Sequence, residues 1–281
     1  RPTALRLAQE LDIKGEVKNT GGNVEIIAQA ENEALEEFIR RLIGMFNITS
    51  YNEEKINNKS YTEFKIIHST NDNDIPFITP DLATCPNCEK ELKDENNRRY
   101  KHPFISCINC GARYTIINTL PYDRENITMS VFPLCDECQK EYTTPQDIRC
   151  HAQTIACNDC GPTTSITIGE AVQTLKNGEI LAIKDIGGYH LSCLCETECA
   201  TKLREIKGRE TKPFAVMFKN IDEIAKYCEI SDKEQELLLS PARPIVLLKA
   251  KKEFPIGVCD GSDCIGAFLP CNPIQILILD K

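Results

Sequence analysis

The sequence predicts an α+β chain made of more than one domain. Three observations lead to this prediction: helical and alternating apolar periods follow each other in the first 70 residues, four CxxC motifs come next, and helices and strands return after residue 162. The 281 residues are enough for two or three modest domains. We therefore expect a first domain at 1–70, a cysteine-rich region at 80–162 and an α/β domain at 166–281.

The first region predicts a small sheet covered by helices. Residues 2–13 and 31–45 carry apolar side chains at helical spacing, whereas residues 15–19, 24–30 and 62–67 have the pattern of strands. The first two strands form a hairpin around a glycine turn. The order helix, strand, strand, helix, strand predicts a ferredoxin-like βαββαβ unit whose first strand is missing. A polar linker at 68–76 is expected to end this region.

Two residues of this region carry a resemblance to a known pattern. Arg1, which precedes a proline and a helix, and Asn19, at the end of Gly15-x-Val17-x-Asn19, resemble the acylphosphatases. The resemblance implies that Arg1 holds the phosphoryl group of an acyl phosphate and that Asn19 positions the attacking water. Asn23 stands where that family usually has glycine, and the phosphate loop of the family lies outside the sequence. The alternative is that Arg1 is a frayed terminus and Asn19 a turn residue.

Four CxxC motifs organise the second region into two cysteine repeats, residues 85–110 and 135–160. Eighteen residues separate the two motifs of each repeat. Two CxxC turns close a four-thiolate shell around one ion, so we predict two zinc ribbons that hold two structural zinc ions. The predicted ligands are Cys85, Cys88, Cys107, Cys110, Cys135, Cys138, Cys157 and Cys160. The alternatives are a thioredoxin-like dithiol, which needs a single motif in a βαβ setting, and disulfides, which need an oxidising compartment.

The similarity between the two cysteine repeats extends beyond the cysteines. The shift that aligns Cys85 with Cys135 also aligns Arg99 with Arg149 and Gly111 with Gly161. We expect both glycines to take a positive φ. The basic side chains at 98–102 are candidates for binding a phosphate.

Eight further cysteines remain once the predicted zinc shells are filled. Cys193, Cys195 and Cys199 are candidates for a third metal site, but the CxCx3C spacing lacks a clear fourth ligand nearby. We favour the interpretation that the eight are small buried side chains or harmless surface thiols in a reducing cell. The other five are Cys150, Cys228, Cys259, Cys264 and Cys271.

The last region predicts alternating helices and strands with one cationic loop. Lys207, Arg209 and Lys212 lie on a glycine- and proline-containing loop between a helix and a strand at 214–218. Such a loop can grip a triphosphate, or it can be a solvated basic loop. Composition alone favours neither interpretation.

A second resemblance favours the triphosphate. Residues 181–191, 207–213, 244–248 and 266–270 look like the YrdC domain, an α/β fold that binds ATP and makes an acyl adenylate. The serine and asparagine nucleotide contacts of that domain lie outside the sequence. The resemblance implies ATP with magnesium as co-substrate, bound by Lys184, His190, Lys207, Arg209 and Lys212.

The three regions in this order resemble the HypF carbamoyltransferases of NiFe hydrogenase maturation. The resemblance implies an enzyme that hydrolyses carbamoyl phosphate and activates the carbamate with ATP as carbamoyl adenylate. It also implies transfer of the carbamoyl group to the C-terminal cysteine of HypE, toward the cyanide ligand of the hydrogenase iron. A further C-terminal domain of that family carries out the final transfer, so we expect this chain to hold only the first stages.

Two alternatives belong to other classes. Zinc ribbons beside a YrdC-like domain are also compatible with an RNA-binding protein or a tRNA threonylcarbamoylation enzyme, and a fragment can be an inert scaffold with intact zinc sites. The formal charge of −9 argues against a dominant hold on nucleic acid or on an anionic membrane.

The ends of the chain and its apolar runs bear on its location. No apolar run approaches the length of a membrane span, and no signal-peptide pattern opens the chain, so we expect a cytoplasmic protein. The chain begins at Arg1 without a methionine and stops directly after the apolar run at 276–279. We therefore expect a fragment that lacks both ends.

Overall fold

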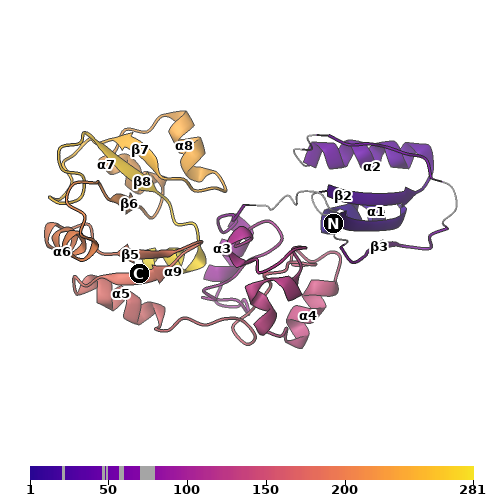
Figure 1. Cartoon of the computed structure of the whole chain (residues 1–281), viewed down its shortest axis with the longest axis horizontal. Helices are drawn as coiled ribbons and strands as arrows, with labels where there is room; N and C mark the ends of the chain where they lie inside the picture. The colour runs from indigo at the N-terminus through magenta and orange to yellow at the C-terminus, as the bar shows by residue number, and fades with distance from the viewer. Residues whose placement is uncertain (21–22, 46–47, 49, 57–59, 70–79) are drawn as a thin grey trace. The chain divides into compact units, whose positions relative to one another are not determined.

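The structure, a computed structural model, describes residues 1–281 except 21–22, 46–47, 49, 57–59 and 70–79 (Figure 1). The described residues fall into two compact units that interleave along the sequence. Unit 1 comprises Arg1–Thr79, Ile117–Val131 and Gln139–Gln153, whereas unit 2 comprises Pro80–Ile116, Phe132–Cys138 and Thr154–Lys281. The domain boundaries expected from the sequence stay predictions, and residues 70–76 of the expected linker lie outside the described residues.

The first part of unit 1 has the predicted order of helices and strands. Its elements are α1 (Pro2–Glu10), β1 (Lys14–Thr20), β2 (Asn23–Gln29), α2 (Asn32–Met45) and β3 (Phe64–Ile66). The sheet has the order β2-β1-β3, with β2 antiparallel to β1 and β3 parallel to it. The helix α1 is shorter than predicted, because Asp12 takes a left-handed φ of 51° and ends the helical run.

The helices of unit 1 bury their apolar faces in one core with the sheet. Leu7 and Ala8 of α1, Phe38 of α2 and Val17 of β1 are almost completely buried in this core. Gly15 of β1 has a φ of +148°, and a Cβ there would lie 1.9 Å from the carbonyl oxygen of Ile27. The hairpin therefore requires glycine at this position, as the close approach of two backbones usually does.

The two cysteine repeats are built from helices and turns. Each begins with an eight-residue helix directly after its first cysteine, α3 (Pro86–Lys93) in the first repeat and α4 (Asp136–Thr143) in the second. Three short 3-10 helices follow α3, at Tyr114–Ile116, Arg124–Asn126 and Thr128–Val131. Within the described residues 80–162 the backbone forms isolated bridges but no named strand. The N-terminal turn of a helix suits a CxxC motif because its free N–H groups favour thiolates.

Equivalent backbone positions in the two repeats have the same conformation. Lys101 and His151 both lie in the left-handed region, with φ of 54° and 52°. The N–H of Lys101 donates to the carbonyl of Leu92 at 2.9 Å, and the N–H of His151 donates to that of Tyr142 at 2.9 Å. The repeat predicted from the sequence is therefore present in the backbone.

The two aligned glycines have different reasons for being glycine. Gly111 has the expected positive φ, at 88°. The expectation is wrong for Gly161, which is not among the positive-φ glycines. A Cβ on Gly161 would lie 2.8 Å from the Cβ of Ala156 and 2.9 Å from Cε1 of His102. Close packing, and not a left-handed backbone, excludes larger residues there.

The rest of unit 2 alternates helices and strands as predicted. Its elements are α5 (Ile168–Lys176), β4 (Leu181–Lys184), β5 (Tyr189–Ser192), α6 (Thr197–Lys207), β6 (Ala215–Met217), α7 (Ile221–Tyr227), α8 (Asp232–Leu239), β7 (Val246–Lys249), β8 (Cys264–Phe268) and α9 (Pro273–Leu279). β4 and β5 form an antiparallel hairpin, and a second sheet has the order β6-β8-β7. β6 is parallel to β8, whereas β7 is antiparallel to it.

Apolar side chains from the second sheet and its helices fill the main core of unit 2. Ile224 of α7, Leu238 of α8, Leu248 of β7 and Ile265 of β8 are fully buried there. A smaller core lies between α5, β4 and α9, where Ala171, Ile183 and Ile278 are buried together. Among the helices that the structure describes, none is long and apolar enough to cross a membrane.

Candidate functional site

The predicted metal ligands come together in two groups of four cysteines. In the first group, neighbouring Sγ atoms lie 3.7 Å apart for Cys85 and Cys107, and 3.8 Å apart for Cys107 and Cys110. In the second group, the Sγ of Cys157 lies 3.7 Å from that of Cys160. A zinc ion with four sulfurs at about 2.3 Å separates them by about 3.8 Å in a tetrahedron. Both groups therefore fit a tetrahedral ion with four thiolate ligands.

The sulfur shells are closed. Cys88, Cys107 and Cys110 are buried in the first group, and four sulfurs complete a tetrahedron without an open position for water. Both repeats share a backbone hydrogen bond to sulfur. The N–H of Asn109 donates to the Sγ of Cys107, and the N–H of Asp159 donates to the Sγ of Cys157, at 3.4 Å each. Such closed, hydrogen-bonded shells are typical of structural metal sites and not of catalytic ones.

Two arginines of the first repeat contact the sulfurs of the second. The guanidinium of Arg98 donates to Cys157 at 3.1 Å and to Cys135 and Cys138 at 3.3 Å. Arg99 donates to Cys138 at 3.4 Å and to the carbonyl of Ala156 at 2.8 Å. Four thiolates around a divalent ion carry net negative charge, which these guanidinium groups offset. These contacts do not favour the phosphate site expected at 98–102, because the guanidinium groups of Arg98 and Arg99 donate hydrogen bonds to cysteine sulfurs.

Arg1 lies in a polar cluster formed with residues far along the chain. Its guanidinium donates to Oδ1 of Asp123 at 2.7 Å and to Oγ of Ser69 at 3.0 Å. Ser69 in turn donates to Oδ2 of Asp123 at 2.9 Å, so both carboxylate oxygens are used. The side chain of Arg1 is only 9% exposed. Arg1 is therefore an ordered side chain in this structure, and the frayed-terminus alternative does not describe it.

Side chains from the end of the second repeat lie near this cluster. Burial lowers the pKa of His151 below its ordinary value, the charge of Arg1 lowers it further, and Asp123 opposes the shift. The ring of His151 lies 5.0 Å from that of Tyr142, whose pKa is raised by burial. Arg124 donates to the carbonyl of Gln153 at 2.7 Å. The surroundings of Arg1 are therefore a partly buried polar site in which histidine is neutral.

Asn19, the second predicted catalytic residue, lies on β1. It pairs with Val24 across the hairpin and is half-buried. Its side chain makes no hydrogen bond within the described residues, whereas Arg1 has two such partners. Sequence reasoning did not identify Asp123 as the partner of Arg1. The available signal was the charged pair Asp123-Arg124 after Pro121 and Tyr122.

The three predicted cations of the basic loop differ in their surroundings. Lys207, the last residue of α6, and Lys212 are exposed, and within the described residues neither ammonium has an ion pair. The guanidinium of Arg209 is turned back onto its own loop, where it donates to the carbonyl of Lys212 at 3.0 Å. The two lysines are thus exposed to solvent, whereas Arg209 contacts its own loop.

Arg204, which sequence reasoning missed, also shapes the basic loop. Its guanidinium donates to the carbonyls of Arg209 at 2.9 Å, Glu210 at 3.0 Å and Gly257 at 2.7 Å. It also lies over the ring of Phe214, 4.7 Å from the centroid. One arginine therefore ties α6 to the basic loop, to Phe214 directly before β6, and to Gly257.

The other two predicted nucleotide ligands lie on the β4-β5 hairpin. Lys184 donates to the carbonyl of Gly187 at the turn, and His190 pairs through Nδ1 with Asp185 at 2.9 Å. Within the described residues, no hydrogen bond or ion pair connects Lys184 or His190 to Lys207, Arg209 or Lys212. The predicted nucleotide ligands therefore fall into two sets that do not contact each other within the described residues: Lys184 and His190 on the hairpin, and Lys207, Arg209 and Lys212 on the basic loop.

The eight remaining cysteines do not add a third group. Within the part of the chain that the structure describes, the metal-competent groups are the two tetracysteine sets. Burial raises the pKa of Cys193 to about 11, with Cys199 adding to the shift. Burial also raises the pKa of Cys150, Cys228 and Cys259. These side chains are protonated thiols at neutral pH, as the favoured interpretation requires.

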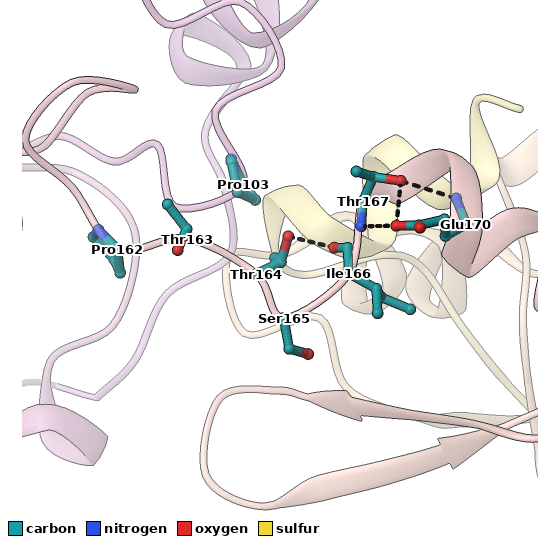
Figure 2. A pocket seen from close by; sticks show the side chains of 8 residues that line it. All are labelled: Pro103, Pro162, Thr163, Thr164, Ser165, Ile166, Thr167 and Glu170. Carbon is teal, nitrogen blue, oxygen red and sulfur yellow. Dashed lines mark hydrogen bonds between the residues drawn. The ribbon is translucent and has the colours of Figure 1, made fainter.

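A cavity of about 300 Å³ lies where the second repeat runs into α5 (Figure 2). It is lined by Pro103 and the segment from Pro162 to Thr167, with Glu170 at one side. The carboxylate of Glu170 accepts hydrogen bonds from the N–H and hydroxyl of Thr167, at 2.7 and 2.8 Å, as part of a capping box. Among the residues that the structure describes, Glu170 is the one charged side chain in the lining, and its carboxylate is engaged in the capping box.

Family profiles match all three regions. The profile described as acylphosphatase matches residues 1–66, and the one described as HypF finger matches 84–117 and 134–167. The Sua5, YciO and YrdC profile, described as telomere recombination, matches residues 173–281. The predicted fold class, an acylphosphatase-like unit, two four-cysteine sites and a YrdC-like domain, is therefore confirmed.

Curated relatives match the chain at 35 to 41% identity. The carbamoyltransferase HypF of Synechocystis sp. is 38% identical over 100% of this chain and 39% of its own length. The probable carbamoyltransferase HypF of Methanocaldococcus jannaschii is 40% identical over 100% of this chain and 40% of its own length. That of Rhodobacter capsulatus is 41% identical over 72% of this chain and 29% of its own length. The chain thus spans well under half the length of these relatives.

Two solved structures are also similar over the whole chain. The crystal structure of full-length HypF in the phosphate- and nucleotide-bound form has a TM-score of 0.93 and 40% identity, and 39% of it is covered. The crystal structure of HypF from T. kodakarensis has a TM-score of 0.89 and 36% identity, and 38% of it is covered. In both cases 100% of this chain is aligned.

Proposed function

This chain belongs to the HypF family of carbamoyltransferases, and we propose that it supplies the first two stages of a carbamoyl transfer. In the first stage, water cleaves carbamoyl phosphate to carbamate and inorganic phosphate. In the second, the carbamate oxygen attacks the α-phosphate of ATP, which gives carbamoyl adenylate and pyrophosphate. One observation supports this most: the acylphosphatase, HypF finger and YrdC profiles all match this one chain, in that order.

The first stage is assigned to the acylphosphatase-like part of unit 1. Arg1 would bind the phosphoryl group of carbamoyl phosphate through its guanidinium, and Asn19 would orient the attacking water. A guanidinium neutralises phosphoryl oxygens, and an amide orients water without changing its protonation. The ordered guanidinium of Arg1, held by Asp123 and Ser69, supports the assignment, because a fixed donor needs no reorganisation when substrate binds.

The second stage is assigned to the YrdC-like part of unit 2. Lys207 and Lys212 would contact the phosphates of ATP and Arg209 would hold the loop that carries them, with magnesium bound to the triphosphate. Lys184 and His190 would complete the site from the β4-β5 hairpin. The exposed ammonium groups of the two lysines, which have no ion pair within the described part of the chain, support this assignment, since such groups bind phosphates as point charges.

The two tetracysteine sites would hold structural zinc. Their donor sets are all thiolate, the shells are closed, and Arg98 and Arg99 offset their charge, which supports folding as their role. The carbamoyl group would pass to the C-terminal cysteine of HypE, in the cytoplasm, for conversion to the cyanide ligand of a hydrogenase. That final transfer would need a further domain of the HypF family.

The test combines metal content with adenylation. Zinc is counted by atomic emission, and exchange of labelled pyrophosphate into ATP is measured with and without carbamoyl phosphate. Both are measured on this chain and on the full-length HypF protein of the organism that encodes it. We expect two zinc ions in each and exchange that needs carbamoyl phosphate in the longer protein. Zinc without exchange in either, together with salt-sensitive RNA binding, would favour the RNA-binding alternative and contradict the proposal.

A further inference from the structure

Asp185, at the end of β4, is a buried carboxylate surrounded by hydrogen-bond donors. Its side chain is only 4% exposed. Oδ1 accepts from Nδ2 of Asn272 at 2.6 Å, from the N–H of Ile186 at 2.7 Å and from the thiol of Cys271 at 3.3 Å. Oδ2 accepts from Nε2 of Gln275 at 2.7 Å. A carboxylate in an apolar surrounding is costly, and this network supplies the donors that compensate it.

The two amides of this network have their orientation fixed by the start of α9. The Oδ1 of Asn272, the N-cap residue, accepts from the N–H of Gln275 at 3.0 Å. The Oε1 of Gln275 accepts from the N–H of Cys271 at 2.8 Å. Because the oxygen of each amide is occupied by a backbone donor, its NH₂ group must face Asp185. The carboxylate is therefore held by the side-chain amides of Asn272 and Gln275. If either amide rotated by 180°, it would lose both its hydrogen bond to Asp185 and its hydrogen bond from the backbone.

The fifth partner of Asp185 is the exposed side chain of His190 on β5. Nδ1 of His190 lies 2.9 Å from Oδ2, and the histidine side chain is 54% exposed. An ionised carboxylate only accepts hydrogen bonds, so Nδ1 must carry the proton. Nε2 is then the ring nitrogen that remains for a ligand, and in the neutral ring it is an acceptor.

We propose that Asp185 is a positioning residue, which fixes His190 as the Nδ1–H tautomer and presents Nε2 as a hydrogen-bond acceptor for the amide group of an activated carbamate. The inference deepens the proposed function and rests on it for the identity of the ligand. The hairpin connects Asp185 and His190 through a short turn, while α9 holds the carboxylate from the other side. The orientation of one exposed ring is thus set by a buried network that never touches the ligand.

The thiol of Cys271 is a hydrogen-bond donor in this network and not a nucleophile. Burial raises its pKa to about 12, and the nearby charge of Asp185 contributes to the shift. A thiol that stays protonated at neutral pH does not attack an acyl group, because the thiolate is the nucleophilic form. His190, whose side chain is exposed, is therefore the member of the network that remains for a ligand.

The test compares Asp185→Asn, His190→Ala and the double variant in the full-length HypF protein. The first substitution keeps the size of the side chain but adds an NH₂ group that faces the donors of Asn272 and Gln275. We expect carbamoyl-phosphate-dependent pyrophosphate exchange to fall roughly tenfold or more in D185N, and to fall less than about twofold further when D185N is added to H190A. Thr167→Ala, which removes the cap of α5, is the control for a general loss of stability.

Nitrogen NMR of the His190 ring supplies a readout that does not depend on the reaction. In the wild-type protein the neutral ring should carry its proton on Nδ1 and not on Nε2, and D185N should lose this preference. An Nε2–H tautomer in the wild type would overturn the inference. The inference would also fail if D185N reduced pyrophosphate exchange by the same factor in the wild type and in the H190A background. If the wild type shows the expected tautomer but no exchange, the proposed ligand and function fail while the positioning contact stands.

Discussion

Arg98 donates a hydrogen bond of 3.1 Å to the sulfur of Cys157, which lies in the other cysteine repeat. The same guanidinium reaches Cys135 and Cys138, so one side chain of the first repeat serves three of the four sulfurs of the second. The two metal sites are therefore not independent copies. The second depends on a residue that the first supplies.

Replacing Arg98 with Ala should weaken the zinc site of the second repeat and leave that of the first intact. Loss of a hydrogen-bonding group around a metal site typically costs about tenfold to 100-fold in affinity, and we expect about tenfold here. Competition with a chromophoric chelator measures the two dissociation constants. Lys90→Ala, an exposed position on α3, is the matched control. Equal weakening of both sites would contradict the assignment of Arg98 to the second.

Replacing Cys107 with Ser should release about one zinc ion and unfold the first repeat, because metal binding supplies much of the stability of such a small module. Metal content by atomic emission and helicity by circular dichroism report the two effects. Cys195→Ser, at an exposed position outside both groups, should retain both ions. Full zinc retention in C107S would remove Cys107 from the ligand set.

Replacing Asp123 with Ala should destabilise unit 1, since it leaves the guanidinium of Arg1 without its charged partner and Ser69 without its acceptor. Hydrogen bonds to charged groups are worth about 1.5–3 kcal/mol, and we expect a loss in the free energy of unfolding of about that size. Urea unfolding measures it. In an Arg1→Met background the same substitution should cost clearly less, and an equal cost would show that the two residues do not interact.

The stability of unit 1 should fall as the pH falls below the ordinary histidine pKa of 6.5, because burial lowers the pKa of His151 in the folded protein. The unfolded chain then takes up a proton first, so the free energy of unfolding decreases toward acid and is unaffected by His151 above that value. Arg1 acts in the same direction, whereas Asp123 opposes it. Urea unfolding at about pH 5.5 and about pH 7.5 measures the slope.

The control for this pH dependence is His151→Gln, which cannot titrate. Its free energy of unfolding should change less between the two pH values than that of the wild type. Zinc content has to be measured at both pH values, because protonated thiols release zinc in both proteins alike. A slope that is the same in H151Q and in the wild type would assign the effect to other groups.

Replacing Lys207 and Arg209 together with Ala should weaken ATP binding by roughly tenfold or more, since Lys207 would lose a charge-assisted hydrogen bond to phosphate, worth about 1.5–3 kcal/mol. Without Arg209 the loop that carries Lys207 and Lys212 would also lose the contact that holds it. Zinc content should not change. Equilibrium binding of a fluorescent ATP analogue to the full-length HypF protein measures the affinity. Lys233→Ala, on the exposed face of α8, is the control for a general change in charge. Unchanged affinity would remove both residues from the site.

The sequence allowed most elements of the fold and the grouping of the cysteines into two sets of four to be predicted, because both follow from local spacing. Apolar period predicts α1, α2 and the strands of both units, and a CxxC motif identifies its own two ligands. The structure adds that the first motif of each repeat opens a helix, whereas the second motif of each repeat lies in a turn. A CxxC spacing fits a helix start and a strand turn equally well, so it cannot distinguish them.

The contacts that complete the sites were beyond sequence reasoning. Arg1 and Asp123 are 122 positions apart, and Asp185 and Gln275 are 90 apart. Neither pair has a periodic or motif signal that joins its members, because only the tertiary fold brings them together. Arg98 was visible as a basic residue beside the aligned Arg99, yet nothing in its neighbours indicates that it points at sulfur. The predicted catalytic and nucleotide-binding roles stay predictions.

The matching left-handed residues of the two repeats carry the mark of a tandem duplication. Lys101 and His151 have nearly the same φ and the same hydrogen bond back to the preceding helix, although one side chain is a flexible amine and the other an aromatic imidazole. A duplication preserves the path of the backbone, because the cysteines of each copy must stay in position to bind a metal. The side chains between the cysteines are free to differ between the copies. One copy now displays an ammonium over the ring of Tyr100, and the other an imidazole beside Arg1. The two repeats thus share one backbone path, and in the second repeat the residue at this position lies close enough to Arg1 for its charge to act on the imidazole.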